Sequence, residues 1–199
     1  GIKDEEDDYL DGRVHVWMGG AHADAPLADA DVTLSSGATN GGFGQDLVAG
    51  DFDGDGVHEM AISSPYASSY RGQIWVVDSD LELAFSFLGE ETYEIPGWVM
   101  AAGDLDGDGA DELILGAPLN DTADNAAGQV RVYQGGAGFF DEPTLLGRFS
   151  GERHDFQLGS GLATGDLDGD GDDELVMGSV NTYEGFVTKG GRVYVAGAE

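Results

Sequence analysis

The stretch GDFDGDGVHEM (residues 50–60) places four acidic side chains in one short segment between two apolar runs. Nearly the same string returns as GDLDGDGADEL at 103–113 and as GDLDGDGDDEL at 165–175. Carboxylates this close repel one another by about 1 kcal/mol per pair in water, and by several times more when they are partly buried. The threefold repetition of so unfavourable a cluster indicates that each loop holds a positively charged partner.

Each string carries carboxylates at positions 1, 3, 5 and 9 of a nine-residue loop. Glycines at positions 4 and 6 allow positive φ values, so that the alternate carboxylates turn toward one centre. With the carbonyl of position 7 and a water, they supply about six hard oxygen ligands, the set that calcium prefers over zinc or magnesium. The sequence therefore predicts three Ca²⁺ sites. Their ligands are Asp51, Asp53, Asp55, Val57 and Glu59; Asp104, Asp106, Asp108, Ala110 and Glu112; and Asp166, Asp168, Asp170, Asp172 and Glu174, with Val57, Ala110 and Asp172 acting through their carbonyls.

Two other kinds of loop share part of this pattern. An EF-hand or dockerin loop also begins D-x-D-G-D-G, but it closes on a twelfth-position acid and enters a helix. Here the closing acid stands at position 9 and a β-type run follows at once. A solvated hairpin turn explains a single Asp-Gly string, but not three loops with identical acid positions. Position 8 varies among His58, Asp111 and Asp173, and no ligand role is predicted for it.

The strings belong to a larger internal repeat of four predicted strands, A to D, with recurrence intervals of 53 and 62 residues. Each acidic loop joins two apolar runs, A and B, which are predicted to be buried on both faces. A glycine-led alternating run, predicted to be a half-buried strand C, follows at 72–78, 128–135 and 191–197. Strand D is predicted at 81–89 and 143–151, and no long helix is expected. Such units predict an all-β fold, a β-propeller of four-stranded antiparallel blades with the Ca²⁺ loops between strands A and B.

The N-terminal part carries strands C and D of one further unit, at 12–20 and 30–37. The chain is thus predicted to hold a part-blade at 12–40 and blades at 41–94, 95–155 and 156–199, preceded by an acidic tail or linker at 1–11. These units contain 13 strands, about three blades plus part of another, which is not a self-closed ring. Either the chain is a fragment of a larger propeller, or copies combine as a homo-oligomer that completes one.

Composition limits the partners. The 199 residues include 39 acids and 8 bases, a net charge of −31, which argues against binding to nucleic acid and to anionic membranes. There is no cysteine, and no apolar run is long enough for membrane insertion. The acidity favours cations, and its excess over three calcium ions is consistent with a saline habitat or with further, unrecognised metal sites.

The repeats resemble the FG-GAP repeats of integrin α-subunit propellers and their bacterial relatives. GFG at 42–44 and GAP at 116–118 supply the two halves of that motif, with SSP at 63–65 and GSV at 178–180 as looser versions. The chain departs from the pattern at PGW (96–98) and LGSG (158–161), and in having Glu at position 9 where Asp is more usual. The resemblance covers residues 12–197 and implies a propeller with calcium loops between strands A and B, without identifying a ligand.

The predicted function is a non-catalytic, calcium-binding scaffold for protein or glycan binding and adhesion, located outside the cell, at its surface or in the periplasm. Its unknown ligand is expected on the face opposite the calcium loops, where long connections gather aromatic side chains. These candidates are Tyr66, Tyr70, Arg71, Tyr93, Trp98, Tyr183 and Phe186, and packing between blades is the competing role. The alternatives are a propeller module of a carbohydrate-active enzyme, such as a polysaccharide lyase, and a purely structural assembly unit. No catalytic residue is assigned, and Arg153, His154 and Asp155 are interpreted as a solvated turn.

Overall fold

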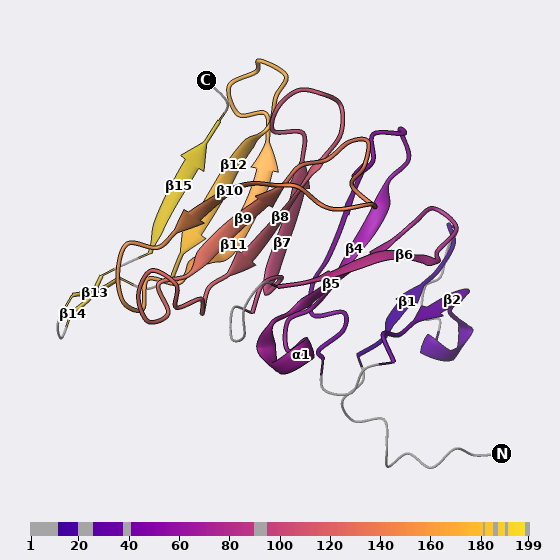
Figure 1. The fold of residues 1–199 in the computed structure, drawn as a ribbon, viewed down its shortest axis with the longest axis horizontal. Helices are drawn as coiled ribbons and strands as arrows, with labels where there is room; N and C mark the ends of the chain where they lie inside the picture. The colour runs from indigo at the N-terminus through magenta and orange to yellow at the C-terminus, as the bar shows by residue number, and fades with distance from the viewer. Residues whose placement is uncertain are drawn as a thin grey trace, which may run out of the picture.

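The computed structural model describes residues 12–19, 26–37, 41–89, 95–180, 182–184, 187–189 and 191–197, and the predicted tail at 1–11 lies outside them (Figure 1). The described chain is built almost wholly of β-strands, joined by one 3-10 turn, η1 (Leu27–Asp29), and one helical turn, α1 (Ala67–Tyr70). The expectation of no long helix is therefore confirmed for these residues. Nor does any helix within them have the length and apolar character needed to cross a membrane.

Two complete blades occupy the middle of the chain, and both are four-stranded antiparallel sheets in simple chain order. The first consists of β3 (Leu47–Gly50), β4 (Glu59–Ser64), β5 (Gln73–Val77) and β6 (Leu83–Leu88). The second consists of β7 (Val99–Gly103), β8 (Glu112–Ala117), β9 (Gln129–Tyr133) and β10 (Leu145–Ser150). The predicted order A-B-C-D is confirmed in both sheets, because each strand pairs with the next along the chain.

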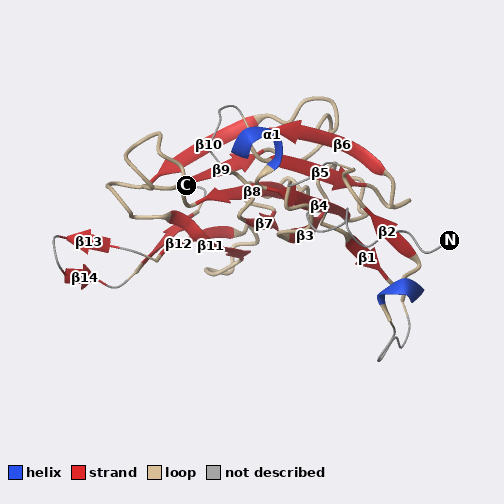
Figure 2. Ribbon diagram, turned by 90° about the horizontal axis from the view of Figure 1, so that it is seen from below, coloured by secondary structure: helices blue, strands red, loops and turns tan. Residues whose placement is uncertain are grey.

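Incomplete blades flank these two. A three-stranded sheet contains β11 (Leu158–Gly165), β12 (Glu174–Ser179) and β15 (Arg192–Ala196), and an N-terminal hairpin contains β1 (Val14–Val16) and β2 (Val32–Leu34). Figure 2 shows the sheets as successive layers, with β3, β7 and β11 along one side of the array and β6 and β10 along the other. This is the blade arrangement of a β-propeller.

The connection between β12 and β15 contains two strands that are not part of the predicted A-to-D unit. The structure places a two-stranded sheet there, formed by β13 (Thr182–Glu184) and β14 (Val187–Lys189). The described residues therefore contain fifteen strands rather than thirteen. Each of these strands is only three residues long, which is too short for an alternating pattern to predict a strand from sequence.

The apolar core is divided among the spaces between sheets, and strand β8 shows how. Leu113 and Leu115 belong to the cluster shared with the first blade, whereas Ile114 belongs to the cluster shared with the three-stranded sheet. All three are at most 1% exposed. Because successive side chains of a strand point to opposite faces, one strand stabilises two interfaces, with about 1.5–3 kcal/mol for each side chain buried.

Burial depends on the neighbouring sheets as well as on the strand's own pattern. The third strand β9 was predicted to be half-buried, but all five of its residues are buried, including Arg131, which donates through Nε to Gln129 Oε1 at 2.7 Å. The first strand β3 was predicted to be buried on both faces, yet its Leu47 is 46% exposed. The second blade has a sheet on each side, whereas the described N-terminal hairpin offers the first blade only two strands.

The glycine of the Phe-Gly pair is retained even where the phenylalanine is lost. Gly44, Gly97 and Gly159 have φ values of +84°, +79° and +86°; the first two precede β3 and β7, and Gly159 is the second residue of β11. An L-residue pays a steric cost in this region, so the backbone turn, and not the aromatic ring, is the constant requirement. A Cβ on Gly97 would also lie 2.7 Å from Ile74 Cδ1 of the preceding blade.

Candidate metal centres

The three acidic loops lie at equivalent places in three successive sheets. They join β3 to β4, β7 to β8 and β11 to β12, at the edge of the array that is uppermost in Figure 1. In each sheet the strand pairing continues up to the loop, through the pairs Gly50–Glu59, Gly103–Glu112 and Gly165–Glu174. The residue at position 9 is thus held by the sheet itself, opposite the glycine that precedes position 1.

The loop backbone has the curled form that the glycines were expected to allow. In the first loop Gly54 and Gly56 have φ values of +77° and +90°, and the corresponding glycines of the other loops lie between +72° and +108°. The carboxylate of Asp51 accepts hydrogen bonds from the N–H groups of residues 54, 55 and 56, at 2.9, 3.0 and 2.9 Å. The first acid therefore anchors the turn.

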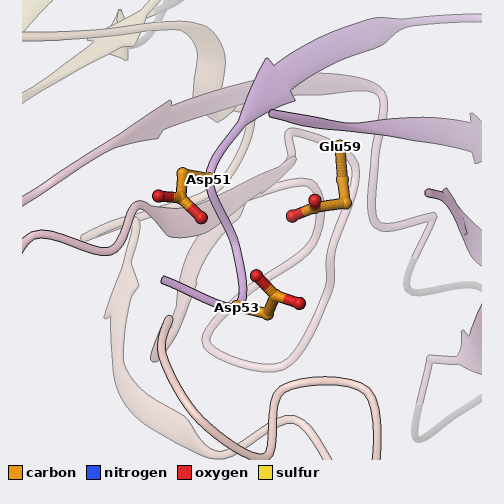
Figure 3. A group of neighbouring side chains, drawn as sticks. All are labelled: Asp51, Asp53 and Glu59. Carbon is orange, nitrogen blue, oxygen red and sulfur yellow. The ribbon is translucent and has the colours of Figure 1, made fainter. Parts of the chain in front are cut away.

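In each loop the structure brings three of the four predicted carboxylates together. The groups are Asp51, Asp53 and Glu59; Asp104, Asp106 and Asp108; and Asp166, Asp168 and Glu174, each with carboxylate oxygens mutually within 4.8 Å. Figure 3 shows the first group, whose side chains surround a common space. Oxygens at about 2.3–2.6 Å from one Ca²⁺ lie no more than about 5.2 Å apart. The spacing and the all-oxygen donor set therefore fit calcium.

The remaining predicted ligands lie on the same loops but outside these groups. Asp55 and Asp170 are exposed, and each accepts the N–H of the position-7 residue, at 2.8 Å from Val57 and 3.0 Å from Asp172. In the middle loop the position-7 residue is Ala110, whose N–H donates to Asp108 at 2.9 Å. These bonds engage the N–H of the position-7 residue, whereas the predicted ligand group of that residue is its carbonyl.

The glutamates at position 9 are buried in the first two loops. Glu112 is 0% exposed and accepts the N–H groups of Leu105 at 2.7 Å and Gly135 at 3.2 Å. Burial raises the pKa of Glu112 to about 7, and the nearby carboxylates of Asp106 and Asp108 add to the rise. Burial likewise raises the pKa of Glu59, against the opposing hydrogen bond from Phe52 N–H. A cation beside these groups would reverse the shift, because it stabilises the ionised form.

Position 8, to which sequence reasoning gave no role, joins neighbouring loops. Asp111 N–H donates to the carbonyl of Asp51 at 2.8 Å, and Asp51 N–H donates to Asp111 Oδ2 at 2.8 Å. Asp173 N–H donates to the carbonyl of Asp104, also at 2.8 Å. The only signal in the sequence is that this position is Asp in the second and third loops and His in the first.

The opposite edge of the array carries α1 and the β13–β14 hairpin (Figure 1). There Tyr66 meets Tyr70 edge-on at 5.9 Å and Trp98 edge-on at 6.0 Å, so three of the predicted ligand-face aromatics form one cluster from two blades. Tyr70 is 44% exposed, and Arg71 Nε donates to the carbonyl of Gly89 at 2.9 Å. Tyr93 and Phe186 lie outside the described residues, and Tyr183 falls within β13.

The polar trio between β10 and β11 lies at the surface. His154 Nε2 is 2.9 Å from Asp155 Oδ2, with side chains 53% and 37% exposed. Arg153 lies 3.9 Å from the carboxylate of Glu152. Such exposed pairs contribute little to stability, and their exposure agrees with the interpretation as a solvated turn.

Together, the layered four-stranded sheets and the acidic loop between the first two strands of each repeat define a β-propeller built from loop-bearing repeats. Comparison with protein families agrees: the FG-GAP repeat matches residues 43–77, 96–133 and 158–195, more than half of the sequence. The chain belongs to the FG-GAP repeat family.

Curated relatives include integrin α-subunits. Integrin alpha-PS2 of Drosophila melanogaster is 34% identical over 150 residues, which is 72% of this chain and 11% of that protein. Integrin alpha-5 of Xenopus laevis is 30% identical over 144 residues, 69% of this chain and 14% of that protein. Phosphatidylinositol-glycan-specific phospholipase D of Homo sapiens is 27% identical over 118 residues, 53% of this chain and 14% of that protein. The chain thus spans only a small part of the length of these relatives.

Proposed function

We propose that this chain is a calcium-loaded propeller module and that each acidic loop binds one Ca²⁺. The observation that carries the proposal is the repeated geometry, in which three carboxylates of each loop gather within 4.8 Å at the same point of three successive blades. Without a cation these groups repel one another, and burial has already raised the pKa values of Glu59 and Glu112. A divalent ion offsets the repulsion and holds strands A and B together.

The test of this proposal is a calcium titration of the full chain by isothermal calorimetry after treatment with EGTA. Three bound ions are expected, and Asp53→Asn, Asp106→Asn and Asp168→Asn should each weaken the ion of the loop that carries the substitution. Magnesium at the same concentration serves as the competitor, because it needs a tighter octahedral shell. Absence of heat from calcium in the wild-type chain would overturn the proposal.

The module acts as a binding or adhesion scaffold outside the cytoplasm, with its ligand on the edge opposite the calcium loops. Support comes from the similarity to integrin α-subunits and from the partly exposed cluster of Tyr66, Tyr70 and Trp98. Partly exposed aromatic side chains provide large contact areas for proteins and for the faces of sugars. A glycan-array screen of the wild type and of Trp98→Ala tests this face, with Leu47→Ala, on strand β3, as the control. Glycans that the wild type binds should be lost in Trp98→Ala and retained in Leu47→Ala.

A catalytic propeller module is the second candidate, and one comparison favours it. The similarity to phosphatidylinositol-glycan-specific phospholipase D shows that related repeats occur in a protein named as an enzyme. Incubation of the calcium-loaded chain with polysaccharides and with phosphatidylinositol-glycan, followed by product analysis, separates the candidates. Bond cleavage supports the enzyme, and binding without products supports the scaffold.

Further blades complete the ring, supplied either by a longer form of the protein or by other copies. Support comes from equivalent third-strand positions: Val130 and Val132 are 0% and 5% exposed, whereas Val193 and Val195 are 71% and 59% exposed. The apolar pattern is kept on a sheet face that the described residues leave uncovered. Sedimentation with calcium gives the mass: multiples of the chain support assembly of copies, and a monomer supports a larger propeller.

A further inference from the structure

The eighth position of each acidic loop is the point where neighbouring loops meet. Two hydrogen bonds of 2.8 Å connect Asp111 with Asp51, one through each residue's N–H. The same position one blade later repeats the main-chain bond, from Asp173 N–H to the carbonyl of Asp104 at 2.8 Å. Both contacts end on the first residue of the preceding loop, the residue whose carboxylate anchors that loop.

The glycines that precede the first two loops leave room for this contact. A Cβ on Gly50 would lie 2.9 Å from Asp111 Oδ2, and a Cβ on Gly103 would lie 2.5 Å from Asp173 Oδ2. A Cβ on Gly165, which precedes the last loop, would meet no atom within 4 Å. The close approach therefore occurs where a further loop follows in the array.

A second connection runs beside the first between the same two loops. Gly136 N–H, in the segment between β9 and β10, donates to the carbonyl of Phe52 at 2.9 Å. Its neighbour Gly135 donates to Glu112 Oε1 at 3.2 Å. The segment thus contacts position 2 of the first loop and position 9 of the second, so neither loop can rearrange without disturbing the other.

We propose that Asp111 and Asp173 are positioning residues that couple adjacent calcium sites, so that ion binding in one loop raises the affinity of the preceding loop. This inference rests on the proposed calcium function. An ion in the second loop orders Asp111, and Asp111 in turn fixes the N–H and carbonyl of Asp51. The first loop then loses less conformational freedom when it binds its own ion, which produces positive cooperativity. By linkage the effect is reciprocal.

Nuclear magnetic resonance can follow each loop separately in the full chain. The amides of Gly56 and Gly109, at position 6, donate to Asp51 Oδ2 and Asp104 Oδ2 at 2.9 Å, and Gly171 occupies the same position in the third loop. Their signals therefore report ion binding in their own loops during a calcium titration. We name each loop by its reporter, so that the first, second and third are the Gly56, Gly109 and Gly171 loops. Asp111→Ala should weaken calcium binding at the Gly56 loop about tenfold and leave the calcium affinity of the Gly171 loop unchanged.

Matched variants separate coupling from general damage. His58→Ala changes the exposed position-8 residue of the first loop and should shift none of the three affinities. Asp111→Asn retains an oxygen that can accept the Asp51 N–H, and it should restore most of the lost affinity. Asp106→Asn removes a ligand of the middle loop and should weaken the Gly56 loop as well, because an ion in the middle loop is what orders Asp111.

The outcomes distinguish the two proposals. If all three loops bind calcium and Asp111→Ala leaves the Gly56 loop unchanged, the coupling is overturned while the calcium function stands. If no loop of the wild-type chain binds calcium, both proposals fall. Should Asp111→Ala not fold, Asp106→Asn asks the same question with Asp111 in place, and an unchanged affinity of the Gly56 loop would again overturn the coupling.

Discussion

Phe52 and Phe139 stack with their ring centroids 5.3 Å apart and their planes inclined by 19°. Phe52 is position 2 of the first acidic loop, and Phe139 lies in the segment between β9 and β10 of the next blade. Both rings are at most 2% exposed. A loop that is polar at alternate positions is therefore fixed in the apolar core shared by two blades.

Removing the Phe139 ring should lower both the free energy of unfolding and the calcium affinity of the first loop. Phe139→Ala leaves a cavity beside Phe52, and such truncations cost about 3–5 kcal/mol. Thermal unfolding measures the first effect, and calcium titration of the Gly56 amide measures the second. Phe140→Ala, at a partly exposed ring beside it, is the control and should cost less. Equal losses in the two variants would contradict the role given to the stack.

Chelation should lower the melting temperature sharply. Calcium at about 100 times its Kd adds about 2.7 kcal/mol for each site, so three sites add about 8 kcal/mol. In a chain of this length that corresponds to a shift of the order of 20 °C. The measurement is a calorimetric scan with calcium and with EGTA, at constant ionic strength. A melt that EGTA leaves unchanged would argue against structural calcium.

Protonation of Glu112 should favour the folded state in the absence of calcium, and it should weaken calcium binding when calcium is present. In the ion-free protein the folded-state pKa of about 7 lies above the ordinary 4.5, so the contribution to stability is full below pH 4.5 and is lost as the pH rises through 7. That contribution is about 3 kcal/mol for a shift of this size. With calcium the ionised form is needed, so affinity at the second loop should fall as the pH drops below 7.

Glu112→Gln removes this titration and supplies the comparison. Without calcium, the difference in unfolding free energy between pH 5 and pH 8 should be smaller in Glu112→Gln than in the wild type. Denaturant unfolding in EGTA at the two pH values measures it. The same difference in both proteins would contradict the raised pKa.

The glycine of the Phe-Gly position should resist substitution. In Gly97→Ala the new Cβ combines a φ of +79° with approaches of 2.7 Å to Ile74 and 2.9 Å to Ser63, so a loss of about 1–3 kcal/mol is expected. Gly147→Ala, on β10, meets no atom within 4 Å and is the matched control. Unfolding free energies from denaturant titration test the pair, and similar values for the two would contradict the steric argument.

Local pattern was sufficient for most of the fold. Strands A to D and the acidic loops follow from hydrophobic runs, glycines and spacing, because strand formation and loop curl depend on neighbouring residues. The burial of β9 and the exposure of Leu47 were predicted wrongly, since each depends on whether a sheet lies against the strand. The β13–β14 hairpin was missed because each of its strands is only three residues long, too short for a recognisable alternating pattern.

The sequence by itself determined the repeat, the order of the strands and the alternate carboxylates of each loop, since all of these are written in residue spacing. Only the tertiary structure showed that Asp111 reaches Asp51, 60 positions earlier in the chain, and that Phe139 covers Phe52. Contacts between blades join residues whose separation is set by the lengths of intervening strands and turns. A local sequence pattern does not specify this separation, so the contact between the acidic loops could be identified only from the packing of one sheet against the next.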